Sequence, residues 1–155
     1  MQPQFTLVFE PNTRDALLLE EALKQENLTF PARVLRHASE LQSYLVGAGI
    51  YSNRELYPMP TLLLLDFCEG VTSTPLLEWL GNRRFLDQFA VIGMGSHMSA
   101  HVLQIAFDLG LNAYFEKREG LSALAKMISR VEWFENGELQ IPEATLITEE
   151  NLSEL

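Results

Sequence analysis

The stretch TLLLLDFCEG, from Thr61 to Gly70, decides the fold of this chain. Its four consecutive leucines, Leu62 to Leu65, are typical of a short strand that is covered on both faces, as strands of parallel sheets are. The run ends on a carboxylate, Asp66. Because a charge is costly to bury, we expect the strand to leave the core at that residue.

The same type of segment recurs along the chain, and each occurrence is followed by a helical pattern. We predict strands at residues 5–9, 31–35, 61–66, 89–94 and 112–116, and helices at residues 14–25, 38–46, 75–82, from 99 to about 109, and 121–134. Strict alternation predicts parallel strands joined by right-handed crossovers, with helices on both faces. The sequence therefore predicts an α/β fold, a flavodoxin-like three-layer sandwich with a five-stranded parallel sheet in the order 2-1-3-4-5.

Composition and charge exclude several classes of function. The chain has 155 residues and a net charge of −10, so it lacks the basic surface that nucleic acid binding needs. No apolar run is long enough to span a membrane, and no secretory signal is visible at the N-terminus. A single cysteine, Cys68, rules out an internal disulfide. We therefore expect a cytoplasmic protein that binds neither nucleic acid nor membrane.

The acidity is concentrated at the C-terminus. Residues 135–155 contain six glutamates and no lysine or arginine. We predict two parts, a domain at 1–134 and an extended acidic tail at 135–155. Alternating apolar residues in the tail suggest that it packs against the domain or against a second subunit.

Polar residues stand where the predicted strands end. Strand 1 ends on Glu10, strand 3 on Asp66, strand 4 on Gly95 and Ser96, and strand 5 reaches Lys117. The carboxyl ends of parallel strands share one edge of the sheet, where ligands of such folds bind. Two carboxylates there need a cation between them, which either a lysine or Mg²⁺ would supply. The alternative is that each polar residue only marks the end of a strand.

Four segments carry a resemblance to a known family: LVFEPNTRDALLLEEAL, GIYSNRELYPMPTLLLLD, LLEWL and AFDLGLNAYFEK. Together they make the chain resemble a receiver domain of two-component response regulators, which have the chemotaxis-regulator fold. The tyrosine-rich, proline-containing loop before the third strand is similar to that of single-domain regulators associated with phytochrome-type histidine kinases. The resemblance covers about residues 5–134.

The resemblance implies a role for particular residues. Asp66 takes the place of the phosphoacceptor, whose carboxylate attacks a phosphohistidine to form an acyl phosphate. Lys117 takes the place of the lysine that pairs with it. Glu10, Asp66 and the backbone carbonyl of Cys68 take the places of Mg²⁺ ligands. Tyr114 takes the place of the aromatic switch residue.

Other positions depart from the pattern of the family. Pro11 stands where a second acid is usual, so we expect a weakened Mg²⁺ site. The switch hydroxyl maps to Gly95, with Ser96 adjacent, and the proline that usually follows the lysine maps to Arg118. After the phosphoacceptor, residues 69–71 read Glu-Gly-Val where Pro-Gly is usual.

Three interpretations follow. The first is a single-domain response-regulator-like protein of a phosphorelay, which is no enzyme beyond phosphorylation and dephosphorylation of its own Asp66. Its partners would be a histidine kinase, of the phytochrome type by resemblance, and a second copy of itself in a homodimer. The second is a pseudo-receiver that acts as an interaction module without phosphorylation. The third is a flavodoxin-like protein that binds a small ligand through Glu10, Asp66 and the glycines at 93 and 95.

Overall fold

Strand β3 (Leu62–Asp66) lies at the centre of a sheet and is completely buried. The computed structural model describes residues 5–26, 28, 31–67, 73–130, 132–133, 139–140 and 146–154. Leu62 to Leu65 are each 0% exposed, because alternate side chains enter two apolar cores on opposite faces. The prediction of a strand covered on both faces is confirmed.

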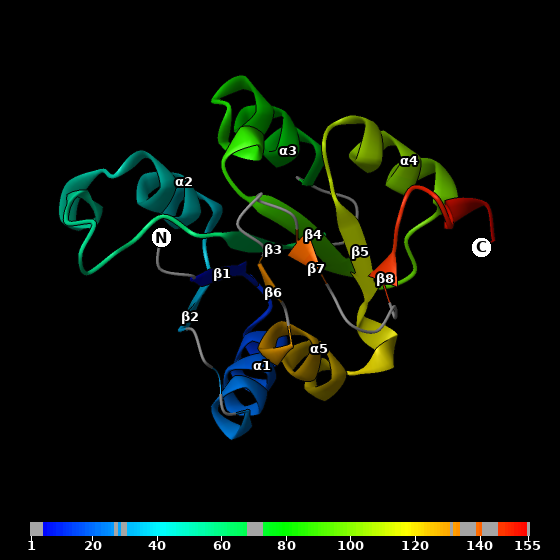
Figure 1. Ribbon diagram of the computed structural model, residues 1–155, viewed down its shortest axis with the longest axis horizontal. Coiled ribbons are helices and arrows are strands. Elements are labelled where there is room, and N and C mark those ends of the chain that lie inside the picture. Colours follow the sequence, from blue (N-terminus) through cyan, green and yellow to red (C-terminus); the bar gives the residue numbers. More distant parts are fainter. Residues whose placement is uncertain are drawn as a thin grey trace.

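Around β3, strands and helices alternate as the sequence predicts. The strands are β1 (Thr6–Phe9), β2 (Ala32–Leu35), β4 (Ala90–Gly95), β5 (Ala113–Glu116) and β8 (Leu146–Ile147), and the helices are α1 (Thr13–Gln25), α2 (Ala38–Val46), α3 (Ser73–Asn82), α4 (Ala100–Asp108) and α5 (Leu121–Ser129). The described residues also form the 3₁₀ turns η1 (Gly49–Ser52), η2 (Phe85–Asp87), η3 (Lys117–Glu119) and η4 (Leu152–Glu154). Helices α2, α3 and α4 cover one face of the sheet, and α1 and α5 cover the other (Figure 1).

The order of the sheet is β2-β1-β3-β4-β5-β8. The five strands predicted from the sequence are parallel and lie in the predicted order 2-1-3-4-5. The prediction of a five-stranded sheet is wrong, because β8 adds a sixth strand, antiparallel to β5. Without β8, the outer side of β5 would expose unpaired N–H and C=O groups at the edge of the sheet. The C-terminal segment pairs with some of these groups.

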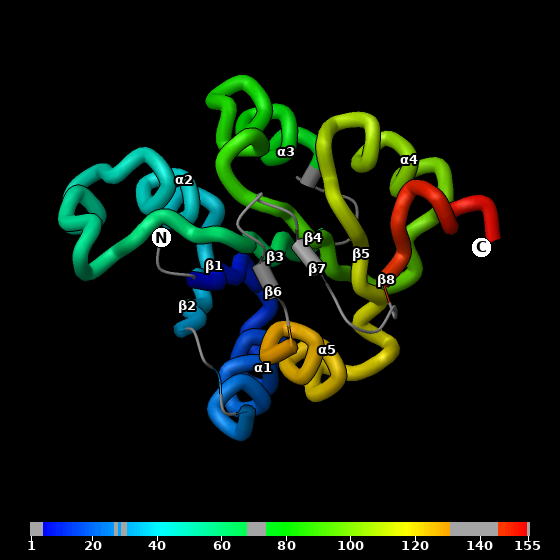
Figure 2. Tube along the Cα trace, viewed as in Figure 1, coloured from blue at the N-terminus to red at the C-terminus, as the bar shows by residue number. Residues whose placement is uncertain are grey.

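The C-terminal segment 146–154 lies against its own domain, beside β5 and α4 (Figure 2). Leu146 and Leu152 are each only 6% exposed, and they join the apolar cores on the two faces of the sheet. The Gln104 side-chain amide on α4 donates a hydrogen bond to Glu149 Oε1 at 3.4 Å. Of the two possibilities predicted for the tail, packing against the domain is therefore observed for these residues.

The end of α5 differs from its prediction. The helix stops at Ser129 instead of continuing to Phe134, and Phe134 lies outside the described residues. The Arg130 N–H bonds to the carbonyl of Met127 in a tighter turn. A two-stranded antiparallel ladder follows, in which β6 (Glu132–Trp133) pairs with β7 (Leu139–Gln140). The pairing gives the backbone groups of β6 hydrogen-bond partners that a continued helix would otherwise have provided.

The tyrosine-rich loop before β3 is held by Arg54. Its guanidinium donates hydrogen bonds to the carbonyls of Tyr44 at 2.8 Å and Leu45 at 2.9 Å, which belong to the last turn of α2. The Tyr44 hydroxyl in turn donates to the carbonyl of Pro58 at 2.8 Å. Helix ends leave such carbonyls without intrahelical partners, so Arg54 caps α2 and fixes the loop that leads into the central strand.

No helix within the described ranges combines the length and the apolarity that crossing a membrane requires.

We expect Arg54→Met to lower the free energy of unfolding by about 2 kcal/mol, since it removes charged hydrogen bonds from partly buried carbonyls. Urea denaturation of the variant and of the unchanged protein measures the difference. Arg14→Met is the matched control, because Arg14 is exposed on α1. Equal losses in the two variants would contradict the capping role of Arg54.

Candidate functional site

An open pocket of about 480 Å³ lies at the carboxyl edge of the sheet. Its walls come from the ends of β3 and β4 and from the segments that follow β1, β3, β4 and β5. The lining residues are Pro11, Asn12, Asp15, Asp66, Phe67, Gly95, Ser96 and Lys117. This is the edge at which the sequence predicts a site, and β1 and β3 are direct neighbours there.

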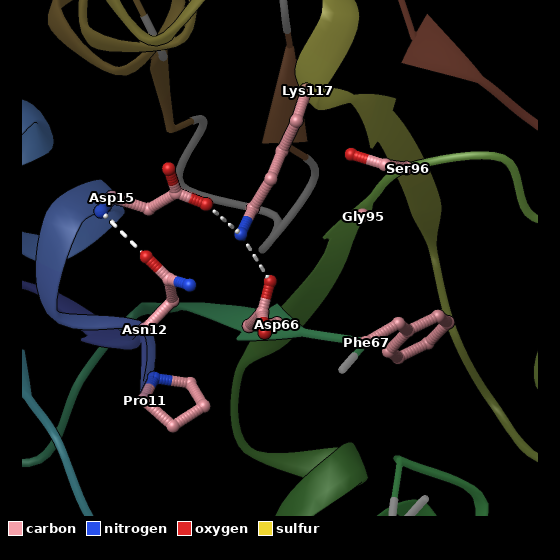
Figure 3. Close-up of a pocket in the computed structure, with 8 residues that line it drawn as sticks. All are labelled: Pro11, Asn12, Asp15, Asp66, Phe67, Gly95, Ser96 and Lys117. Carbon is pink, nitrogen blue, oxygen red and sulfur yellow. Dashed lines mark hydrogen bonds and ion pairs between the residues drawn. The ribbon is translucent and has the colours of Figure 1, made fainter. Parts of the chain in front are cut away.

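Lys117 joins the acidic residues of this edge. Its Nζ lies 2.6 Å from Glu10 Oε2 and 2.6 Å from Asp66 Oδ1. It also lies 2.9 Å from Asp15 Oδ2. Figure 3 shows the lysine reaching down so that its ammonium stands between Asp15 and Asp66. The structure therefore brings together the predicted trio of Glu10, Asp66 and Lys117.

Asp15 is the residue that the sequence analysis missed. It lies in the first turn of α1, and its backbone N–H donates to the Asn12 side chain at 2.9 Å. The N-cap of α1 is thus Asn12. The sequence did contain a signal for Asp15. When a helix directly follows a strand, its first turn lies at the same edge of the sheet as the end of that strand. An acid in that turn could have been added to the predicted site.

Glu10 is buried and does not line the open pocket. It is 0% exposed, and both of its carboxylate oxygens have partners: Oε1 accepts from the Asn12 N–H at 3.0 Å, and Oε2 contacts Lys117. Burial raises the pKa of Glu10 to about 7, and the charge of Asp66 also raises it, while the contact with Lys117 lowers it. Burial would lower the pKa of Lys117, but hydrogen bonds to Asp66, Glu10 and Asp15 raise it above its usual value.

The predicted Mg²⁺ ligands are arranged differently from a preformed metal site. Glu10 would have to release Lys117 or Asn12 to bind a metal, and Cys68 lies outside the described residues, as do residues 69–71. Among the residues that the structure describes, no group of three or more acids, histidines or cysteines is arranged to hold a metal ion. With Lys117 in place, this donor set does not fit a divalent cation, and the roles assigned to these residues remain predictions.

Gly95 lines the pocket, and Tyr114 is buried behind it. A Cβ at Gly95 would lie 3.0 Å from Tyr114 Oη and 3.3 Å from the carbonyl of Phe67. The Tyr114 ring is completely buried, and its centroid lies 6.0 Å from that of Phe67. Burial raises the pKa of the Tyr114 hydroxyl, and the charges of Glu116 and Asp66 raise it further. A side chain at position 95 would therefore start in tight contact with the tyrosine hydroxyl, while Ser96 is exposed at the rim.

We expect Glu10→Gln to flatten the pH dependence of stability between about pH 4.5 and 7. The native carboxyl keeps its proton up to about pH 7, whereas its usual pKa is 4.5. The native state therefore binds more protons in this window, so the free energy of unfolding falls as the pH rises through it, by roughly 3 kcal/mol. Glutamine does not titrate, so the variant lacks this decline.

Urea denaturation at several pH values measures this effect. Glu21→Gln serves as the control, because Glu21 is exposed on α1. A decline in Glu10→Gln as steep as that of the unchanged protein would show that Glu10 does not titrate in this window.

Comparison with known proteins gives a similarity of structure. No protein-family model and no curated protein sequence matches the chain. Among solved structures, the bacteriophytochrome response regulator AtBRR has 26% sequence identity and a TM-score of 0.64, with 92% of this chain and 100% of that chain covered. The phosphorylated cyanobacterial phytochrome response regulator RcpA has 23% identity and a TM-score of 0.67, with 83% and 90% covered.

A third similar structure is the Mn²⁺-bound form of the response regulator Rcp1, with 24% identity and a TM-score of 0.67, covering 91% of this chain and 100% of that one. The alignments cover 90–100% of the length of these regulators. The chain thus has the fold of response-regulator receiver domains, and its resemblance to the phytochrome-associated regulators among them is confirmed.

Proposed function

We propose that this protein is a single-domain receiver of a phosphorelay and that Asp66 is its phosphoacceptor. The observation that carries the proposal is the contact of Asp66 with Lys117 at 2.6 Å, at the base of an open pocket at the carboxyl edge of the sheet. The carboxylate is 4% exposed, so it is held in one place while the pocket gives a donor access to it.

The geometry suits phosphoryl transfer to a carboxylate. An Asp66 oxygen would attack the phosphorus of a phosphohistidine, forming an O–P bond as the P–N bond breaks and the electron pair returns to the imidazole. Lys117 stands beside this carboxylate, where its positive charge would meet the oxygens of the transferred group. Apart from this transfer and the hydrolysis of the resulting acyl phosphate, the proposal assigns no enzymatic activity to the chain.

The partner we propose is a histidine kinase, of the phytochrome type. The support is that the similar regulators AtBRR and RcpA are both described as phytochrome or bacteriophytochrome response regulators. We keep Mg²⁺, at a site weakened by Pro11, as a proposal that requires Lys117 to leave the carboxylates that it contacts. The related finding is the Mn²⁺ bound to Rcp1.

A pseudo-receiver is the second candidate, and two observations favour it. Pro11 lines the pocket without offering a carboxylate, and Gly95 lines it without a hydroxyl. Tyr114 Oη stands 3.0 Å from the place of a Cβ at position 95, so a hydroxyl side chain there would require the tyrosine to shift by a few tenths of an ångström. In this case the domain would act through protein contacts alone.

Asp66→Asn is expected to abolish phosphorylation by acetyl phosphate, because an amide cannot replace the nucleophilic carboxylate. Intact-protein mass spectrometry after incubation, with and without Mg²⁺, measures the added phosphoryl group. Asp87→Asn is the control, since Asp87 is exposed and outside the pocket.

A gain in mass that persists in Asp66→Asn would refute Asp66 as the phosphoacceptor. The pseudo-receiver is favoured if the unchanged protein gains no mass while the double variant Pro11→Asp with Gly95→Ser gains the mass of a phosphoryl group.

We also propose a homodimer that uses the face of α4, β5 and α5, to which the tail contributes. The support is that segment 146–154 lies along β5 and α4 and buries Leu146 and Leu152 there. Removing residues 135–155 would uncover this face and weaken the dimer.

Sedimentation velocity of the full chain and of the chain ending at Phe134 measures the masses. A full chain that sediments as a monomer refutes the dimer, and equal dimer stability in both refutes the contribution of the tail.

A further inference from the structure

The side chain of Asp15 has no part in the function proposed above, although it lines the pocket. Its Oδ2 atom lies 2.9 Å from Lys117 Nζ, and the side chain is 30% exposed. Of the described residues that line the pocket, only Asp15 and Asp66 carry a negative charge. Figure 3 shows the two carboxylates on either side of the lysine ammonium. A phosphodonor that reaches Asp66 therefore comes close to a second carboxylate.

Asp15 is not required to hold the lysine in place. Lys117 Nζ lies 2.6 Å from Glu10 and 2.6 Å from Asp66, whose side chains are only 1% and 4% exposed. The contact with Asp15 is longer and more open to water, which screens its contribution. The hydrogen bond between Asp15 and Asn12 uses the backbone N–H of Asp15 and not its carboxyl. Replacing this carboxylate should therefore change the charge of the pocket wall and leave its frame intact.

The carboxylate acts on a phosphodonor through its charge. A fixed negative charge beside the reacting phosphorus repels an anion that approaches it and attracts a cation. In an acyl phosphate, the leaving group departs as a carboxylate anion. In protonated phosphoramidate or phosphohistidine, the leaving group carries a positive charge until the P–N bond breaks. Since the transferred phosphoryl group is the same in all of these donors, Asp15 discriminates between their leaving groups.

We infer that Asp15 is a specificity-determining residue of the pocket, which favours phosphodonors with a positively charged nitrogen leaving group over acyl phosphates. The inference rests on the proposed function, because it concerns transfer to Asp66. In either reaction an Asp66 oxygen forms the new O–P bond. With acetyl phosphate, the P–O bond breaks and its electron pair leaves with acetate. With phosphoramidate, the P–N bond breaks, its electron pair stays on nitrogen, and ammonia departs.

Two small phosphodonors of different charge test the inference. Rates of phosphorylation by acetyl phosphate and by phosphoramidate are measured by intact-protein mass spectrometry in the full-length unchanged protein and in Asp15→Asn, at one Mg²⁺ concentration and one ionic strength. We expect the ratio of the phosphoramidate rate to the acetyl phosphate rate to fall at least about fivefold in Asp15→Asn, mostly because acetyl phosphate reacts faster. A loss of stability alone would change both rates in proportion and leave this ratio unchanged.

Matched variants separate charge from shape. Asp15→Glu keeps the negative charge and should keep a ratio close to that of the unchanged protein. Glu21→Gln removes a charge from an exposed position of α1 outside the pocket and should also leave the ratio unchanged. Adding about 0.5 M NaCl should lower the ratio more in the unchanged protein than in Asp15→Asn, because salt screens the carboxylate.

The possible results separate this inference from the proposed function. An equal or higher ratio in Asp15→Asn overturns the inference, while phosphorylation that disappears in Asp66→Asn still supports the proposed function. If neither donor phosphorylates Asp66 in any variant, the proposed function and the inference both fail. Asp15→Ser, which also lacks the charge, repeats the comparison if Asp15→Asn is unstable.

Discussion

Two acidic side chains are buried at the edge of the sheet, and the ammonium of Lys117 makes their burial possible. Glu10 is 0% and Asp66 4% exposed, and an isolated carboxylate in such surroundings would take up a proton or turn toward water. Lys117 contacts both at 2.6 Å, so one cation at the end of β5 fixes the ends of β1 and β3. The shape of the pocket depends on this ion cluster, because each of its members belongs to a different segment of the chain.

The sequence predicts most of this arrangement because the fold has a strong local signal. Buried parallel strands are continuous apolar runs, so the leucines before Asp66 identify the central strand, and the alternation of strands with helices predicts the order of the parallel strands. Glu10, Asp66 and Lys117 could then be placed at one edge from topology alone. Only the structure shows that both carboxylates contact the same nitrogen atom of Lys117, because the directions of side chains do not follow from the order of strands.

Features that depend on packing between distant segments were not predictable in the same way. Asp15 joins the site through the capping of α1 by Asn12, a geometric detail that the apolar pattern does not contain. Strand β8 has only two residues, and it forms because β5 offers an edge for pairing, so its own sequence carries little signal. The end of α5 at Ser129 has the same cause, since pairing of β6 with β7 outweighs the continuing apolar pattern.

Tyr114 belongs to two structural units at once. Its backbone is the register partner of Ile147 in β8, and its buried hydroxyl lies behind Gly95, 3.0 Å from where a Cβ would stand. The last strand pair of the sheet and the pocket residue Gly95 are therefore connected through one residue. Loss of β8 from the sheet would take the pairing partner away from a residue that packs directly behind the pocket.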